Sequence, residues 1–347
     1  MNSATLSINL TAIAENWSHL QRLSNSSVST AAVVKANAYG LGIKPIAQHL
    51  FETGVRTFFV STVDEAVDLR LILNHPVDIY YLNGYSTGDS SAIDDFRIMP
   101  VLNSLEQIKN FKNQTKGKKA AIQIDLGMNR LGIDEADIVK VKAESETFEI
   151  NLLLGHLSSA DDENAVQNKH QCDLFCKLAK SFQSTPKSLA ATGGILLGKD
   201  YHFDITRPGI GIFGGYPLKE AANVIMIDLP VLQVKHIGKN VGIGYNHTFT
   251  TSSPRKIATV ASGYADGLSR QLSNTGALYA GNVQCPILGR VSMDLITVDV
   301  TSLVTVPNSL SVVNSDHTID ELADQSSTIG YEILTSLGSR YKRVYHY

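Results

Sequence analysis

Short apolar runs alternate with amphipathic segments over the first two thirds of this chain, and that alternation limits its fold more than any other feature. Eight of the apolar runs have the length and composition of β-strands. They are residues 32–34, 57–61, 78–82, 98–102, 121–125, 150–155, 188–191 and 209–213. Segments with helical spacing lie between several of them, at residues 44–52, 63–73, 104–111, 135–143 and 163–182. Because parallel strands need a crossover connection, this order predicts a parallel sheet flanked by helices.

The number of strands favours a closed sheet. A TIM-type (β/α)8 barrel takes about 250 residues or fewer, which this part of the chain supplies. A doubly wound open sheet is the alternative, although no GxGxxG pattern opens a helix after the first strand. Thr62 with Glu65, and Ser104 with Gln107, have the spacing of capping boxes at helix starts. We therefore predict an α/β fold with an N-terminal barrel.

The pattern changes after residue 217. Helical periodicity is largely absent until residue 319, and short β-rich runs separated by Gly, Asn and Ser take its place. These runs are residues 224–227, 231–236, 256–261, 277–280, 283–288 and 295–300. The change predicts two domains, a barrel over residues 1–219 and a mostly β domain over residues 220–347.

Composition argues against several classes of protein. Hydrophobic residues make up 43% of the chain and charged residues 18%, which suits a large core. A net charge of −3 gives no sign of a surface for nucleic acid or an anionic membrane. The three cysteines match neither a disulfide framework nor a zinc site. With no signal-peptide pattern and no long apolar run, we predict a cytoplasmic protein without a metal, a membrane or a nucleic-acid partner.

Lys35 ends the first predicted strand, within the stretch VVKANAYGLG. A lysine at the mouth of a buried strand loses hydration, which disfavours its charged form and lowers its pKa. Such an amine can act as a nucleophile or a base, and one chemistry that uses it is a Schiff base to pyridoxal phosphate. A strand end whose lysine simply reaches solvent is the alternative.

Other polar residues follow the same rule, since barrel enzymes carry their function at the carboxyl ends of the strands. Arg130 follows the fifth predicted strand, His156 ends the sixth, and Arg207 stands at the start of the eighth apolar run. Thr192 and two glycines follow the seventh, where barrels commonly bind phosphate through backbone N–H groups and hydroxyls. Taken singly, each residue also fits an ordinary role in a turn, an ion pair or the core. Their joint placement favours a phosphate site beside the lysine.

Six motifs closely resemble those of the alanine racemase family, in order from about residue 6 to residue 341. They are KANAYG (35–40), GMNRLG (127–132), RPGI (207–210), GY (244–245), GYADG (263–267) and VSMD (291–294). The resemblance implies a homodimer with shared active sites, with pyridoxal 5′-phosphate as its cofactor. It also implies interconversion of L- and D-alanine, which supplies D-alanine for peptidoglycan.

The resemblance also assigns roles to individual residues. Lys35 would bind the cofactor and serve as one of two acid/base groups, with Tyr245 of the partner subunit as the other. A tyrosine hydroxyl titrates near ~10, so a nearby cation from the Arg207 and His156 network would have to stabilise its phenolate. Arg207 would face the pyridine nitrogen and leave it unprotonated, because arginine does not give up its proton.

Ligand residues complete the implied site. The cofactor-binding set is Lys35, Tyr39, His156, Thr192, Arg207, Gly209, Ile210 and Tyr341. Arg130 and the backbone N–H of Met293, from the partner subunit, would hold the substrate carboxylate, with Asp294 and Tyr264 nearby. Many family members place a carbamylated lysine where this chain has Gln123, so a neutral hydrogen bond would have to orient Arg130.

Three alternatives stay open within the same fold type: a racemase of broader specificity, a basic amino acid decarboxylase, and a non-catalytic protein that binds the cofactor. Broad-specificity racemases usually carry a secretion signal, and decarboxylases carry a catalytic cysteine in the C-terminal domain. Cys285 is the only cysteine in that part of this chain. Non-catalytic relatives generally consist of the barrel alone, so the β domain with Tyr245 and Met293 favours an enzyme.

Overall fold

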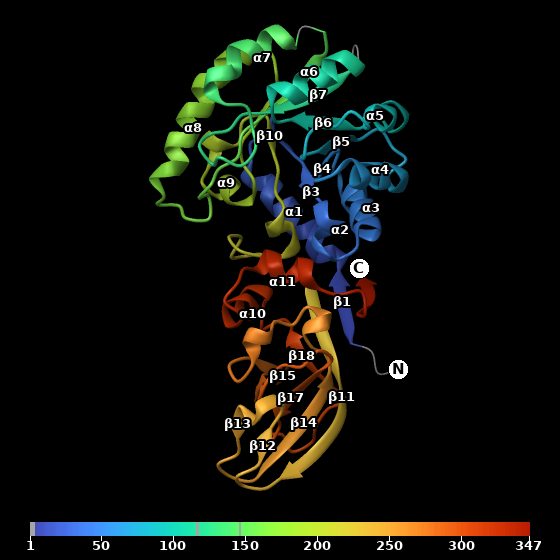
Figure 1. Cartoon of the computed structure of the whole chain (residues 1–347), viewed down its shortest axis with the longest axis vertical. Helices are drawn as coiled ribbons and strands as arrows, with labels where there is room; N and C mark the ends of the chain where they lie inside the picture. The colour runs from blue at the N-terminus through green and yellow to red at the C-terminus, as the bar shows by residue number, and fades with distance from the viewer. Residues whose placement is uncertain (1–3, 116–117, 146) are drawn as a thin grey trace. The chain divides into compact units, whose positions relative to one another are not determined.

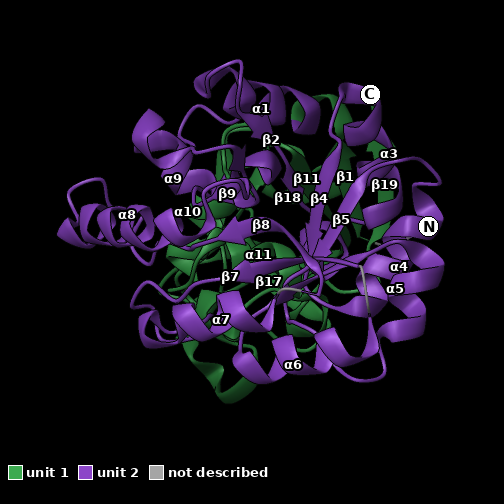
Figure 2. Ribbon diagram, turned by 90° about the horizontal axis from the view of Figure 1, so that it is seen from above, with its two compact units in different colours: residues 1–12, 222–347 green, residues 13–221 purple. Residues whose placement is uncertain are grey.

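The computed structural model describes residues 4–115, 118–145 and 147–347, and the chain divides into two compact units (Figure 2). One consists of Ile13–Ala221 and is called the barrel unit below. The other combines Met1–Ala12 with Ala222–Tyr347 and is called the β unit. The sequence placed residues 1–12 with the barrel, and the structure places the described part of them, residues 4–12, with the C-terminal residues instead.

Seven parallel strands of the barrel unit pair in sequence order (Figure 1). They are β3 (Ala32–Val33), β4 (Thr57–Val60), β5 (Asp78–Tyr81), β6 (Met99–Leu102), β7 (Lys119–Gln123), β8 (Glu149–Leu154) and β9 (Lys187–Ser188). Helices connect them and lie around the strands in Figure 2. The main ones are α3 (Ile43–Thr53), α4 (Val63–Ile72), α5 (Ser90–Phe96), α6 (Leu105–Gln114), α7 (Ile138–Glu144) and α8 (Val166–Ala179).

An eighth strand, β10 (Ile205–Thr206), closes the barrel. On one side it pairs in parallel with β2 (Ser29–Thr30), and the N–H of Val33 donates to the carbonyl of Pro208 at 2.9 Å. On the other side the N–H of Arg207 donates to the carbonyl of Ala190, just beyond β9, at 2.8 Å. The strand therefore joins the last and first strands of the sheet, which confirms the predicted TIM-type barrel.

The eighth strand lies earlier than predicted. Residues 209–213 form a short 3-10 helix, η4 (Ile210–Phe213), and not a strand. A short buried apolar run looks the same in sequence whether it becomes a strand or a helical turn, so periodicity could not separate the two. As a consequence Arg207 directly follows the eighth strand, at its carboxyl end, where the other site residues also lie.

Both predicted helix starts are present in modified form. The hydroxyls of Thr62 and Ser104 accept the third N–H of their helices, each at 3.2 Å. The side chains of Glu65 and Gln107 return to the backbone one residue before the cap instead of to the cap itself. In the described residues, none of the helices has the length and apolar character that crossing a membrane requires.

The β unit is built on a mostly antiparallel sheet. Its strands are β1 (Thr5–Asn9), β11 (Ile225–Ile237), β14 (Arg255–Ala261), β15 (Ala277–Ala280), β16 (Val283–Pro286), β17 (Leu295–Asp299), β18 (Ser309–Val313) and β19 (Lys342–His346). Two helices follow β18, namely α10 (Ile319–Gln325) and α11 (Gly330–Ser336). Strand β1 pairs antiparallel with β11 and parallel with β19, which explains why the first residues belong to this unit.

Candidate active site

The segment after Lys35 is a left-handed turn, α2 (Lys35–Tyr39). The four residues after the lysine, Ala36 to Tyr39, all have positive φ, between 52° and 56°. A left-handed helix costs L-residues about 1–2 kcal/mol each, so such a turn persists only where its surroundings impose it. Two contacts of the turn do so. The Glu65 carboxylate accepts the N–H of Ala36 at 2.7 Å, and the Asn37 side chain accepts the N–H of Ile43 at 2.8 Å.

Lys35 itself is partly buried at the end of the first barrel strand. Burial is the main cause that lowers the pKa of its amine, and the positive charge of Arg130 lowers this pKa further. The Glu65 carboxylate acts in the opposite direction and raises it. The neutral amine is therefore more available than in a solvent-exposed lysine, as the sequence analysis predicted. A neutral amine is the form that attacks a carbonyl carbon.

His156 follows β8 and lies among the cations of the barrel. Burial lowers its pKa to about 3, and the positive charges of Arg207, Arg130 and Lys35 act in the same direction. The structure thus brings these four predicted residues together at the carboxyl ends of the strands. It also changes the expectation for His156, because a neutral imidazole cannot be the cation that stabilises a phenolate.

Arg207 is almost fully buried, with 5% of its surface exposed. Its guanidinium donates to the Ser188 hydroxyl and, at 2.7 Å, to the carbonyl of Gly155, and it lies 5.9 Å from the centre of the Phe59 ring. Burial lowers its pKa to about 10, so it stays protonated at neutral pH. All these partners are neutral, and a buried charge without a counterion favours an electron-rich ligand atom.

Thr192, Tyr39 and Gly209 meet beside this cluster. The Thr192 hydroxyl oxygen accepts the N–H groups of Gly209 and Gly211, each at 3.2 Å. Both lone pairs are then in use, so the hydroxyl can offer a bound anion only its proton. A Cβ on Gly209 would lie 2.3 Å from the Tyr39 hydroxyl, so only glycine lets that hydroxyl come this close. The Tyr39 and Thr192 hydroxyls and the backbone of Gly209, from three separate segments, therefore meet where the sequence predicted a phosphate site.

The carboxylate of Asp125 holds the loop that carries Arg130. Asp125, after β7, accepts the N–H groups of Gly127, Met128 and Asn129. Gln123 donates to the carbonyl of Leu131 at 3.0 Å. The neutral hydrogen bond predicted for Gln123 exists, but it holds the backbone beside Arg130 and not its guanidinium.

Tyr245 and Met293 lie on adjoining loops of the β unit. Tyr245 stands between β12 (Gly242–Ile243) and β13 (Phe249–Thr250), and 69% of its surface is exposed. Met293 is 52% exposed in the loop before β17. A Cβ on Gly289 would lie 2.7 Å from the carbonyl of Ile243, so the two loops are in close contact.

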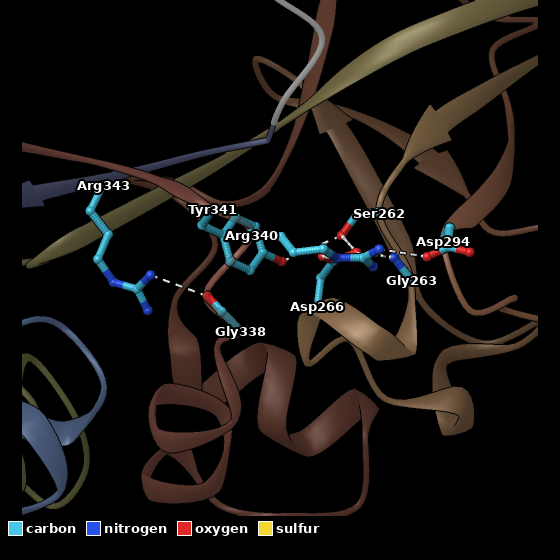
Figure 3. A network of polar contacts seen from close by, with 8 residues as sticks. All are labelled: Ser262, Gly263, Asp266, Asp294, Gly338, Arg340, Tyr341 and Arg343. Carbon is cyan, nitrogen blue, oxygen red and sulfur yellow. Dashed lines mark hydrogen bonds and ion pairs between the residues drawn. The ribbon is translucent and has the colours of Figure 1, made fainter.

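Tyr341 has a place inside the β unit. Only 4% of its surface is exposed, and its hydroxyl lies 3.4 Å from that of Ser262 (Figure 3). Burial raises its pKa to about 12.

Glu65 is the site residue that sequence reasoning missed. It was recognised only through its spacing from Thr62, as a helix cap. Its second carboxylate oxygen reaches the backbone next to Lys35, and its charge acts on the lysine. A sequence signal for this role was absent, because Glu65 and Lys35 are adjacent only through the pairing of β3 with β4.

A closed eight-stranded barrel with a lysine, two arginines and a hydroxyl cradle at its strand ends defines a barrel enzyme. Residues 8–217 match the family profile "Alanine racemase, N-terminal domain" and residues 224–345 match "Alanine racemase, C-terminal domain". The chain therefore belongs to the alanine racemase family.

Individual relatives agree over the full length. The chain is 46% identical over 345 residues to an alanine racemase of Cereibacter sphaeroides, covering 99% of both. The crystal structure of alanine racemase from Bartonella henselae with covalently bound pyridoxal phosphate is 35% identical, with a TM-score of 0.94 and 99% of both chains covered. That of Bacillus anthracis with bound L-Ala-P is 26% identical, with a TM-score of 0.90, covering 100% of this chain and 96% of that one.

Proposed function

We infer that this chain is a pyridoxal 5′-phosphate-dependent racemase that interconverts L- and D-alanine and supplies D-alanine for peptidoglycan. The observation that carries the proposal is a partly buried Lys35 with a lowered pKa, at the same strand ends as Thr192, whose hydroxyl oxygen accepts two N–H groups and keeps its proton for a ligand. Membership of the alanine racemase family supports it, as does the cofactor bound in the Bartonella relative. In line with three free thiols, we place the reaction in the cytoplasm.

The residues present fit this cofactor. Lys35 would join it covalently through its neutral amine, and Arg207 would donate to its ring nitrogen. Its phosphate would be held by Tyr39, Thr192, Gly209 and Ile210, with the neutral His156 beside the arginine. Tyr341 stays a proposed member of this set, because a hydroxyl that contacts Ser262 keeps further hydrogen-bonding capacity. When bound, pyridoxal phosphate withdraws electrons from the α-carbon of the amino acid and so acidifies its proton.

Two residues would move that proton, one on each face of the α-carbon. The lowered pKa of Lys35 leaves a neutral amine that can accept a proton near neutral pH. Tyr245 would serve the opposite face. Since His156 is neutral, Arg207 is left as the cation of the predicted network that can favour a phenolate.

The substrate carboxylate would be held by Arg130 and by the N–H of Met293. We propose that Tyr245 and Met293 act in the barrel of a partner subunit, so that the enzyme is a homodimer with shared sites. The exposure of Tyr245, Tyr264 and Met293, at 69%, 44% and 52%, supports this, because clustered exposed apolar side chains mark interaction surfaces.

Borohydride reduction of the holoenzyme tests the proposal. We expect the reduced cofactor on the peptide that contains Lys35 and on no other, and racemisation that is fastest with alanine in a panel with serine, lysine and glutamate. Comparable rates across the panel would favour the broader-specificity racemase. A labelled but inert protein would favour the non-catalytic alternative, and an unlabelled protein would overturn the cofactor assignment.

A further inference from the structure

Arg340, between α11 and β19, joins two carboxylates of the β unit (Figure 3). Its Nε and Nη2 donate to the two oxygens of Asp266 at 2.7 and 2.8 Å, and its Nη1 donates to Asp294 at 2.7 Å. A two-point pairing with one carboxylate fixes the plane of a guanidinium. The direction of the third nitrogen, Nη1, is therefore fixed, and this nitrogen holds the carboxylate of Asp294.

The Asp266 end of this network is anchored in the interior. Asp266 is 6% exposed, and the N–H of Gly263 donates to its carboxylate at 3.0 Å. It belongs to the turn η6 (Tyr264–Asp266). A Cβ on Gly263 would lie 2.2 Å from the carbonyl oxygen of Ser292, so this turn packs backbone to backbone against the loop of Met293.

The same loop presents the N–H of Met293. The N–H of Tyr264 donates to the carbonyl of Ser292 at 3.1 Å, and the N–H of Ala265 donates to the carbonyl of Met293 at 3.0 Å. Because a peptide unit is planar and trans, a fixed Ser292 carbonyl makes the N–H of Met293 point the opposite way. Arg340 adds a restraint on Asp294, the residue after Met293. Unlike the backbone hydrogen bonds of this loop, this restraint can be removed by a side-chain substitution.

We propose that Arg340 is a positioning residue for the substrate carboxylate: by holding Asp294 against Asp266, it orients the N–H of Met293. The inference rests on the proposed function, in which this N–H binds the carboxylate in the partner's site. Arg340 and Asp294 are 51% and 55% exposed, and exposed ion pairs contribute little to folding stability. The link from Arg340 to Asp294 therefore acts on the direction of a hydrogen-bond donor more than on the stability of the unit.

Steady-state kinetics of the holoenzyme with Arg340→Met and Arg340→Lys test this role. We expect Arg340→Met to raise the KM for both alanine enantiomers about tenfold, the effect of weakening one hydrogen bond to a charged group. The inhibition constant of propionate, which is alanine without its amino group, should rise by the same factor. Meanwhile kcat should change less than about twofold, because the proton-transfer groups are untouched. Lysine should restore part of the effect, since it keeps the charge but not the two-point pairing.

Arg343→Met is the matched control. Arg343 lies three positions further along the chain and donates to the carbonyls of Gly338 and Leu337, and Figure 3 shows its side chain apart from the two carboxylates that Arg340 joins. We expect its KM and propionate constant to equal those of the unmodified enzyme. In Asp294→Asn, which weakens the same pairing, adding Arg340→Met should give less than the product of the two single effects, because the two residues act together.

Three results would overturn the inference: an unchanged KM in Arg340→Met, an equal rise in Arg343→Met, or a loss confined to kcat. Failure of the proposed function would look different. In that case the unmodified enzyme would not racemise alanine, or propionate would not inhibit it.

Discussion

Three cationic side chains create a positive environment at the barrel mouth, and a carboxylate acts in the opposite direction on Lys35. Lys35, Arg130 and Arg207 all act on His156, and Glu65 is the carboxylate that acts on the lysine. A positive environment of this kind favours anionic ligand groups, and in the proposed function these would be the cofactor phosphate and the substrate carboxylate. The sequence predicted the positions of the cations. It could not predict the neutral state of His156, which depends on burial and on charges from three distant segments.

The stability of the enzyme should therefore depend on His156 in acid. The pKa of this residue is lowered to about 3 in the folded chain, against an ordinary value near 6.5. The unfolded chain then binds the extra proton between these two values, so folding stability falls as the pH drops through that window. Between pH 7 and pH 5 the loss attributable to His156 is about 2 kcal/mol.

Urea unfolding of His156→Gln at these two pH values measures that contribution. We expect the difference in unfolding free energy between pH 7 and pH 5 to shrink by about 2 kcal/mol relative to the unmodified protein. His170→Gln, on an exposed face of α8, should leave the difference as it was. An unchanged difference in His156→Gln would mean that the imidazole is protonated in the folded chain.

Among the elements, the left-handed turn α2 shows where sequence reasoning stopped. The sequence predicted that the first strand ends at Lys35, and the structure has a turn there. Its handedness was not predictable, because Ala36, Ala38 and Tyr39 have side chains that normally disfavour positive φ. The contacts that impose it come from Glu65 and from the start of α3, outside the motif itself.

Replacing Ala36 with glycine should reveal this strain. Glycine escapes the left-handed penalty of about 1–2 kcal/mol but gains about 0.4–1 kcal/mol of unfolded-state entropy, so the free energy of unfolding should stay level or rise by up to about 1.6 kcal/mol. Ala14→Gly in the right-handed helix α1 (Leu10–Leu23) should instead lower it by about 1 kcal/mol. Equal losses in the two variants, measured by urea unfolding, would show that the turn is not strained.

Other elements differ from prediction for a related reason. Helix α1 was not predicted, although its buried residues Leu10, Ile13, Trp17 and Leu20 have helical spacing. The run at residues 209–213 was mistaken for a strand. In both segments the spacing of the apolar residues was visible in the sequence. The segments that they pair with decide between helix and strand, and these lie far away in the sequence.

At the scale of the whole molecule, the change to a β-rich pattern predicted two units with a boundary between residues 219 and 220, close to the boundary after Ala221, but not the membership of β1 in the β unit. Strand pairing across more than 200 residues leaves no mark in a five-residue strand. The predicted site is likewise divided. Lys35, Arg130 and Arg207 lie in the barrel unit, whereas Tyr245 and Met293 lie in the β unit.

This division makes the proposed sharing of sites between subunits testable. Lys35→Ala and Tyr245→Phe should each remove most of the activity. If Tyr245 serves the partner's Lys35, a mixed dimer contains one site with both substitutions and one site with neither. Random pairing of equal amounts should then restore about a quarter of the unmodified activity, because half of the dimers are mixed and half of their sites are intact.

Mixing Lys35→Ala with Arg130→Met is the control, because both residues lie in the barrel unit. Each site of that mixed dimer lacks one of the two, so activity should stay at the level of the separate variants. Recovery in the first mixture and none in the second would show that Tyr245 acts across the subunit boundary. No recovery in either mixture, with mixed dimers demonstrated by mass spectrometry, would place Lys35 and Tyr245 of one chain in the same site.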